Sequence, residues 1–435
     1  MKLRGTMQIN EQGHLTIGGC DTVQLAKHFG TPLYVLDEEC LRDACRRYRR
    51  AFSEHYHNAL TVYAGKALLN LAICQIIKEE GLGLDVVSGG ELFTALAAGF
   101  PPERIFFHGN NKTEAEIALG LDRKIGYFMV DNFHEIELLS RLASRRHITA
   151  NVILRIAPGI EAHTHEFIQT GQIDSKFGFT LENGDALLAV KKVIDEPTLS
   201  LRGIHCHIGS QIFELESYVL AAKAMVAFMK TIRDRYQVSV DILNMGGGLG
   251  IYYVPGDAPP TIEEYVSTVS KAVSRECEDL QLPKPMLIVE PGRSIVGPAG
   301  TTLYTVGATK QIPGVRTYVA VDGGMADNIR PALYNAKYEA IVANKARNAD
   351  TNCVSLTGKC CESGDMLAWD LELASCQAGD IIAVPATGAY CYSMASNYNR
   401  LGRPAMVLVK DGQARMIVRR ETYSDLISHD LLLTD

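Results

Sequence analysis

The sequence predicts an α/β protein made of a (β/α)8 barrel and an additional all-β domain. From about residue 60, short apolar runs of β type alternate with longer amphipathic stretches, which is the pattern of βα units in a parallel sheet. Eight such repeats occur in succession, as a closed barrel requires. After Pro298 the chain changes to short β-rich runs separated by Gly, Asp and Asn, which is typical of an all-β domain.

The eight expected strands are short apolar runs, each followed by a polar or Gly-containing segment. They are Thr61–Ala64, Leu84–Val87, Ile105–Phe107, Tyr127–Val130, Val152–Ile156, Gly203–Cys206, Asp241–Asn244 and Leu287–Val289. Amphipathic stretches of helical period lie between them. Examples are Leu69–Glu79, Glu114–Leu121, His134–Leu142, Tyr218–Arg235 and Ile262–Cys277.

Two domains are therefore expected. The barrel takes residues 35–298, and the β-domain combines 1–34 with 299–435. In the latter, Met406–Val409 and Arg415–Val418 flank an Asp411-Gly412 turn signal, which predicts a hairpin. Gly13–Ile17 and the stretch before Pro32 look extended, so the N-terminus is expected to supply the first strands of this domain.

Composition narrows the functional classes. The 435 residues are 47% hydrophobic and 21% charged, with a net charge of −7, which suits a globular protein and argues against a nucleic-acid partner. No apolar run reaches the roughly 18 residues of a membrane span. The eleven cysteines are odd in number and irregularly spaced, and the first residues are too polar for a secretory signal, so a reducing cytoplasm is expected.

Polar side chains cluster where the predicted strands end, the position of functional residues in such barrels. These rim residues are Lys66, Asp85, Arg155, His205, His207, Ser210, Gly246, Gly247, Gly248, Glu290, Pro291, Gly292 and Arg293.

Lys66 and Glu290 each allow two interpretations. Partial desolvation at a strand end lowers the pKa of a lysine amine and suits it to Schiff-base chemistry, whereas a lysine at this position can also simply extend into solvent. The carboxylate of Glu290 suits a pairing with a protonated ring nitrogen, and it equally suits a structural salt bridge. Neither residue decides the function alone.

The glycine run 246–248 exposes backbone N–H groups after the seventh strand, where barrels of this kind commonly bind phosphate. A tight turn would require the same residues. Neither G-x-G-x-x-G nor G-x-x-x-x-G-K-[ST] is present, so the run is no dinucleotide fingerprint or P-loop.

A metal site is not predicted. His205 and His207 share one strand face, and His163 and His165 have the same spacing. No carboxylate or further histidine completes a ligand set from the sequence alone, and H-E-x-x-H is absent. Cys360-Cys361-Glu362 lacks zinc-site spacing, and a reactive thiol there is the more plausible interpretation.

Taken together, these residues resemble the fold-type III pyridoxal-phosphate decarboxylases, and most closely the members that act on meso-diaminopimelate. The likeness spans nearly the whole chain. It is carried by Tyr63–Ala67, Asp85–Leu92, His108–Thr113, His163–His165, Asp174–Phe179, His205–Ile212, Gly246–Ile251, Glu290–Arg293, Asp322–Tyr334, Cys361–Asp365, Gly388–Tyr390, Ser396–Asn399 and Arg419–Leu426. One departure is Leu68, where many relatives have Asn.

The resemblance implies a TIM-like barrel with an alanine-racemase-like β-domain, and pyridoxal 5'-phosphate as the cofactor. It implies that Lys66 forms the Schiff base, that His207 stacks on the cofactor ring, and that Glu290 pairs with the pyridine nitrogen. Cys361 matches the family's proton donor and reaches the neighbouring subunit's site in relatives, which implies a homodimer with shared active sites. The remaining cofactor-binding residues are Asp85, Ser210, Gly246, Gly247, Gly248, Pro291, Gly292, Arg293 and Tyr390.

The substrate can also be argued chemically. The distal end of meso-diaminopimelate carries a carboxylate and an ammonium. Arg293 and Arg330 can pair with a carboxylate, and Glu362 can meet an ammonium. Tyr334, Arg155 and Tyr390 complete the expected substrate contacts, although Arg330 and Tyr334 could also serve loop packing.

The expected reaction is decarboxylation to L-lysine and CO2, the last step of lysine biosynthesis. Four alternatives stay open at this point. They are a basic amino-acid or carboxynorspermidine decarboxylase, a racemase, a non-catalytic cofactor carrier and a sugar-phosphate barrel enzyme.

Overall fold

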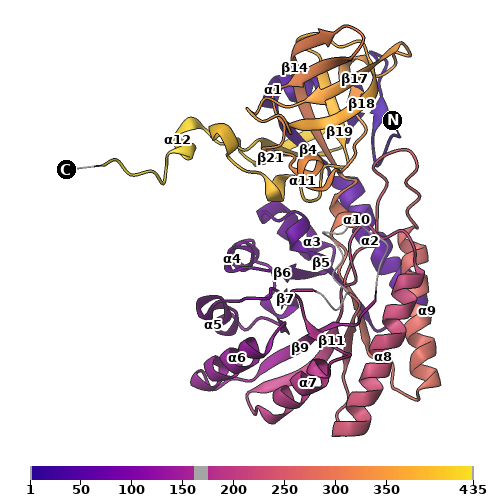
Figure 1. Ribbon diagram of the computed structural model, residues 1–435, viewed down its shortest axis with the longest axis vertical. Helices are drawn as coiled ribbons and strands as arrows, with labels where there is room; N and C mark the ends of the chain where they lie inside the picture. The colour runs from indigo at the N-terminus through magenta and orange to yellow at the C-terminus, as the bar shows by residue number, and fades with distance from the viewer. Residues whose placement is uncertain (1, 161–174, 434–435) are drawn as a thin grey trace. The chain divides into compact units, whose positions relative to one another are not determined.

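The computed structural model describes residues 2–160 and 175–433, which form two compact units (Figure 1). The barrel unit comprises Ala44–Ile251 and Ala258–Ser294. The β unit comprises Met1–Asp43, Tyr252–Asp257 and Ile295–Asp435. The domain division at residues 35 and 298 stays a prediction.

The barrel unit contains the predicted ring of eight parallel strands. In the order of the ring they are β5 (Ala59–Ala64), β6 (Gly83–Val86), β7 (Ile105–Phe107), β8 (Tyr127–Val130), β9 (Ala150–Ala157), β11 (Leu199–His205), β12 (Ile242–Asn244) and β13 (Met286–Val289). Strand β9 pairs with both β8 and β11, and β13 pairs with β5, which closes the barrel. The short strand β10 (Phe179–Thr180) adds to β9 outside the ring. The fold class expected from the sequence is confirmed.

Helices follow the strands and surround them on the outside (Figure 1). They are α3 (Leu71–Glu79), α4 (Gly89–Ala97), α5 (Glu114–Asp122), α6 (Phe133–Arg145), α7 (Asp185–Asp195), α8 (Glu216–Tyr236) and α9 (Ile262–Asp279). Helix α2 (Glu38–His55) precedes the first barrel strand. Side-chain caps explain where several of these helices begin: Thr113 and Glu116 form a capping box at α5, and Thr261 and Glu264 form another at α9, each satisfying backbone N–H groups that lack a helical partner.

An apolar layer fills part of the barrel interior. It consists of Val62, Phe106, Met129, Ile153, Ile242 and Ile288, each at most 2% exposed. Because these side chains occupy the interior, polar groups are left to the rim where the strands end.

The β unit is built on a mixed sheet in which the central strand β14 (Gly300–Ile312) pairs with three others. These are β4 (Leu33–Asp37), β15 (Arg316–Val321) and β19 (Ile381–Pro385). The remaining strands are β1 (Gln8–Ile9), β2 (Leu15–Ile17), β3 (Cys20–Asp21), β16 (Ile341–Val342), β17 (Thr351–Thr357), β18 (Met366–Ala374), β20 (Ala405–Lys410) and β21 (Gln413–Val418). The predicted hairpin is present, because β20 and β21 pair antiparallel around Asp411 and Gly412, both with positive φ.

The stretch before Pro32 was expected to be extended, and this prediction is wrong. Residues Thr22–Phe29 form helix α1. The Asp21 side chain accepts hydrogen bonds from the backbone N–H groups of Val23 and Gln24, and Gly30 ends the helix at a φ of 72°, so both termini are capped. A segment this short has only a weak tendency to form a helix by itself. Burial of Leu25 and Ala26 in the core of the β unit stabilises the helix.

Within residues 2–160 and 175–433, the helices are all too short or too polar to span a lipid bilayer.

The interior layer makes a measurable stability prediction. Ile153 is fully buried among apolar side chains, so Ile153→Ala is expected to reduce the free energy of unfolding by about 2–5 kcal/mol. The matched control is Leu188→Ala on the outside of α7, where the side chain is 49% exposed and a change within about 0.5 kcal/mol is expected. Denaturant titration measures both, and equal losses would contradict the assignment of Ile153 to the core.

Candidate active site

The predicted rim residues of the barrel unit come together at the carboxyl ends of the strands. Lys66 follows β5 in the short helix η1 (Gly65–Ala67), Asp85 lies in β6 and Arg155 lies in β9. The segments of His207, Gly246–Gly248 and Glu290 follow β11, β12 and β13. Six strands thus contribute to one rim.

Lys66 differs from the expectation of partial desolvation, because its side chain is exposed. Its neighbours in helix η1, Gly65 and Ala67, are buried. The charge still acts on the barrel mouth. Burial raises the pKa of Asp85 and lowers the pKa of His207. The positive charge of Lys66 acts to lower the pKa of both groups.

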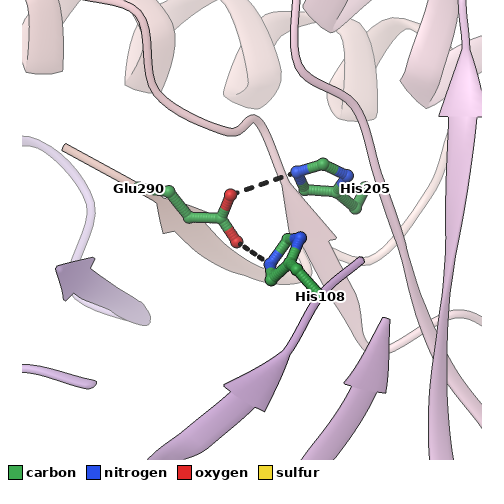
Figure 2. A group of neighbouring side chains, drawn as sticks. All are labelled: His108, His205 and Glu290. Carbon is green, nitrogen blue, oxygen red and sulfur yellow. Dashed lines mark hydrogen bonds and ion pairs between the residues drawn. The ribbon is translucent and has the colours of Figure 1, made fainter. Parts of the chain in front are cut away.

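Glu290 is the centre of a buried polar cluster (Figure 2). Its Oε1 accepts hydrogen bonds from Nε2 of His108 at 2.9 Å and Nδ2 of Asn244 at 2.6 Å. Its Oε2 accepts a hydrogen bond from Nε2 of His205 at 3.1 Å. All four residues are buried. Burial works to raise the pKa of Glu290, but His108 and His205 hold it well below the ordinary value, so the group is a carboxylate.

The two histidines of this cluster have opposite pKa shifts. Burial lowers the pKa of both, and for His205 it prevails, giving a pKa of about 4. His108 also lies 3.9 Å from Oδ1 of Asp85, and the two carboxylates Asp85 and Glu290 raise its pKa above the ordinary value despite burial. His205 is therefore neutral at pH 7 and His108 is biased toward the imidazolium.

His108, His205 and Glu290 also have atoms that could bind a metal ion, all within 4.8 Å of one another. The sequence alone did not place a carboxylate beside two histidines. The Nε2 of each imidazole donates its N–H to Glu290, which leaves that nitrogen no lone pair for a cation. We therefore interpret the group as a hydrogen-bonded cluster. The other histidine pair, His163 and His165, lies outside the described residues.

The glycine run packs too closely for any side chain. A Cβ on Gly247 would lie 2.1 Å from the carbonyl oxygen of Glu290, and one on Gly246 would lie 2.4 Å from that of Cys206. The Gly247 N–H donates to Nδ1 of His207 at 3.2 Å, which requires an unprotonated Nδ1. Burial, followed by the charge of Lys66, keeps the pKa of His207 well below its ordinary value. Beside the run, Arg293 donates to Oγ of Ser210 at 2.8 Å.

A second polar group supports the rim at β7, β8 and β9. Lys112 donates to Oε1 of Glu135 at 2.6 Å, and Glu135 accepts the backbone N–H of Asp131. Asp131 in turn lies 3.7 Å from Nε of Arg155, whose guanidinium stands 4.2 Å from the ring centroid of Phe177. Arg155 is thus held in place by an acid and an aromatic ring.

The other predicted residues belong to the β unit. Arg330 begins helix α11 (Arg330–Tyr334); it is buried, donates to the hydroxyl of Tyr338 and stands 4.8 Å from the ring centroid of Tyr253. Cys361 and Glu362 are exposed, whereas Tyr334 and Tyr390 are half-buried.

Asp365 joins the segments that carry Arg330 and Cys361. It accepts backbone N–H groups from Met325 at 2.6 Å and Cys360 at 2.7 Å. These are the segments that precede the two predicted residues, so one buried carboxylate fixes both within the β unit.

Sequence reasoning missed four residues at the barrel rim. His108 and Asn244 touch Glu290, Asp131 pairs with Arg155, and Glu91 is buried enough near Asp85 that its pKa rises to about 7. All four lie at or just beyond the end of a predicted strand. That position was the available signal, but a single sequence does not say which of these side chains turn inward.

Residues 40–297 match the family model of the pyridoxal-binding domain of pyridoxal-dependent decarboxylases. The chain is 52% identical over 431 residues to diaminopimelate decarboxylase from Bacillus subtilis (strain 168), covering 99% of this chain and 98% of the relative. It is 51% identical over 421 residues to the enzyme of that name from Bacillus methanolicus, covering 97% and 98%. The crystal structure of diaminopimelate decarboxylase from M. jannaschii with L-lysine is similar, with a TM-score of 0.93, 37% identity and coverage of 99% and 98%.

The packing of the glycine run makes a testable prediction. Gly247→Ala is expected to destabilise the protein by roughly 2 kcal/mol or more, because the new methyl group meets a backbone oxygen that cannot move without shifting Glu290. Gly307→Ala in β14 is the control, since its Cβ would meet nothing closer than 3.8 Å. Thermal unfolding measures the melting temperature of both variants. Equal melting temperatures would show that the loop accommodates the added methyl group without loss of stability.

Proposed function

We propose that this chain, which belongs to the pyridoxal-dependent decarboxylases, removes CO2 from meso-diaminopimelate to give L-lysine, the last step of lysine biosynthesis. The observation that carries this function is the identity of about half of all residues, over nearly the whole chain, to relatives named for that activity. The cofactor of the family is pyridoxal phosphate. When bound, it withdraws electrons from the substrate's Cα and so allows the carboxylate to leave.

The rim of the barrel unit fits this cofactor. Glu290 is a buried carboxylate, the partner that a protonated pyridine nitrogen needs. The close packing of Gly246 and Gly247 leaves a loop without side chains after β12, the type of loop that binds phosphate in such barrels. We assign the phosphate side to this loop with Ser210 and Arg293, supported by Pro291, Gly292 and Tyr390.

Three further residues have assigned roles on the barrel side. Lys66 supplies the amine that holds the cofactor, and its exposed position gives the substrate amine access to it. His207 has a neutral imidazole and packs on the flat face of the cofactor without adding charge. Asp85 lies in the cluster of Glu290 and His108 and contributes negative charge at the same end of the site.

The substrate's distal end needs a cation for its carboxylate and an anion for its ammonium. We assign the first role to Arg330, whose guanidinium is buried and fixed by Tyr338 and Tyr253. Glu362 takes the ammonium, Tyr334 and Arg155 add contacts, and Arg293 serves the substrate as well as the phosphate.

After CO2 leaves, a proton must take its place on Cα. We assign its delivery to Cys361, with Lys66 as the alternative donor.

We further propose a homodimer in the cytoplasm. Cys361 and Glu362 are exposed on the β unit, where a second copy can receive them into its own site, as the resemblance implies. All eleven cysteines are free thiols, a state that a reducing compartment preserves.

The central test concerns Lys66. Purified protein loaded with pyridoxal phosphate is expected to release CO2 from meso-diaminopimelate, and Lys66→Ala is expected to lower kcat by at least a thousandfold. Borohydride reduction followed by peptide mapping should label Lys66. Label on another lysine would contradict the assignment, and equal CO2 release from ornithine, arginine or carboxynorspermidine would favour a different decarboxylase.

Shared active sites can be tested by mixing two inactive variants. Lys66→Ala and Cys361→Ala are denatured and refolded together, so that random pairing makes half of the dimers mixed. In a shared arrangement each mixed dimer has one intact site, so about a quarter of the wild-type activity is expected to return. Each variant refolded alone is the control, and no recovery in the mixture would show that Lys66 and Cys361 act within one chain.

A further inference from the structure

His108 and His205 form a matched pair around Glu290. Both are buried, both follow or end barrel strands, and both donate from Nε2 to the same carboxylate. Their rings meet edge to face, with centroids 5.0 Å apart. They differ in their charged neighbours: Nε2 of His108 also lies 3.9 Å from Oδ1 of Asp85. His108 is therefore placed between two buried carboxylates, whereas among the described residues the ring of His205 hydrogen-bonds to Glu290 alone.

The hydrogen bonds of Glu290 leave part of its carboxylate able to accept a further one. A carboxylate offers about four acceptor positions. Among the described residues, His108 and Asn244 use two on Oε1, and His205 uses one on Oε2. One position on Oε2 is left for a further donor.

Two unpaired carboxylates this deeply buried would be costly, and one of them would take up a proton. A cation between them removes that cost. Two carboxylates near His108 favour its protonated form: Asp85 in β6, and Glu290 directly after β13. The positive charge of Arg155 in β9 opposes this protonation. A protonated His108 balances the charge of one carboxylate and works against the burial that raises the pKa of Asp85.

We propose that His108 is the positioning residue of this site: as the imidazolium between Asp85 and Glu290, it keeps Glu290 ionised for the cofactor's ring nitrogen, while His205 serves as a neutral donor. The opposite pKa shifts of the two histidines agree with this division. The inference rests on the proposed pairing of Glu290 with that nitrogen.

The test compares His108→Gln with His205→Gln, because glutamine retains an N–H donor in both cases and only the first substitution removes a positive charge. Pyridoxal phosphate is titrated into the cofactor-free variants and binding is followed by fluorescence. His108→Gln is expected to weaken binding by roughly tenfold or more, since Glu290 then competes for a proton. His205→Gln is expected to cause a clearly smaller loss. Equal losses would overturn the division of roles.

The pH dependence of unfolding gives a second readout that needs no cofactor. The folded-state pKa of His108 is raised, so its stabilising contribution is full below about pH 6.5, the unfolded value, and is lost as pH rises through the folded value. The folded-state pKa of His205 is about 4, so its contribution is lost as pH falls from about 6.5 to 4. The differences between wild type and the two variants should therefore slope in opposite directions, and parallel slopes would contradict the proposal.

Glu290→Gln separates the proposed role of Glu290 from that of His108. If this variant binds the cofactor as wild type does, the proposed role of Glu290 fails. If it binds weakly while His108→Gln and His205→Gln do not differ, only the role of His108 fails. Should His108→Gln not fold, neutron diffraction of the wild-type holoenzyme at pH 7 decides, with hydrogen expected on both ring nitrogens of His108 and on Nε2 alone of His205.

Discussion

Closure of the parallel barrel is the constraint on which the site depends. Because all eight strands run in the same direction and β13 pairs with β5, their carboxyl ends form one ring. Residues as distant in sequence as Lys66 and Glu290 are neighbours at that ring only because the sheet closes. The apolar layer around Ile153 makes this closure favourable, since it removes large side chains from water.

Closure also creates an electrostatic problem. Asp85, His108 and Glu290 are each at most 6% exposed, and a charge placed there without partners would be lost by proton transfer. The structure offsets this cost with a positive charge and with oriented hydrogen-bond donors, chiefly His108 and Asn244. A cluster arranged in this way holds a charge before any ligand binds, which is what preorganised catalysis requires.

The sequence predicted the repeating part of this architecture well. Eight apolar runs with amphipathic stretches between them indicate a barrel, since periodicity reports burial directly. Strand ends such as Lys66, Gly246 and Glu290 could then be placed on one rim by counting. The stretch before Pro32 was misjudged because a short helix such as α1 depends on its caps and on contacts far along the chain, which periodicity does not report.

The candidate site could be predicted only in part for a related reason. His205 and His207 are two residues apart, yet the first donates to Glu290 and the second accepts from Gly247. Sequence spacing placed both side chains on one strand face, and it did not assign either histidine a hydrogen-bond partner. Three-dimensional pairing, which assigns each nitrogen as donor or acceptor, decides the protonation state instead.

The same distinction separates His108 from His205, which have the same side chain, comparable burial and one common partner. A second carboxylate near His108 is enough to reverse the direction of its pKa shift. Charge at this rim is therefore set by which strands are neighbours around the ring, and strand order is a property of the fold that no local motif contains.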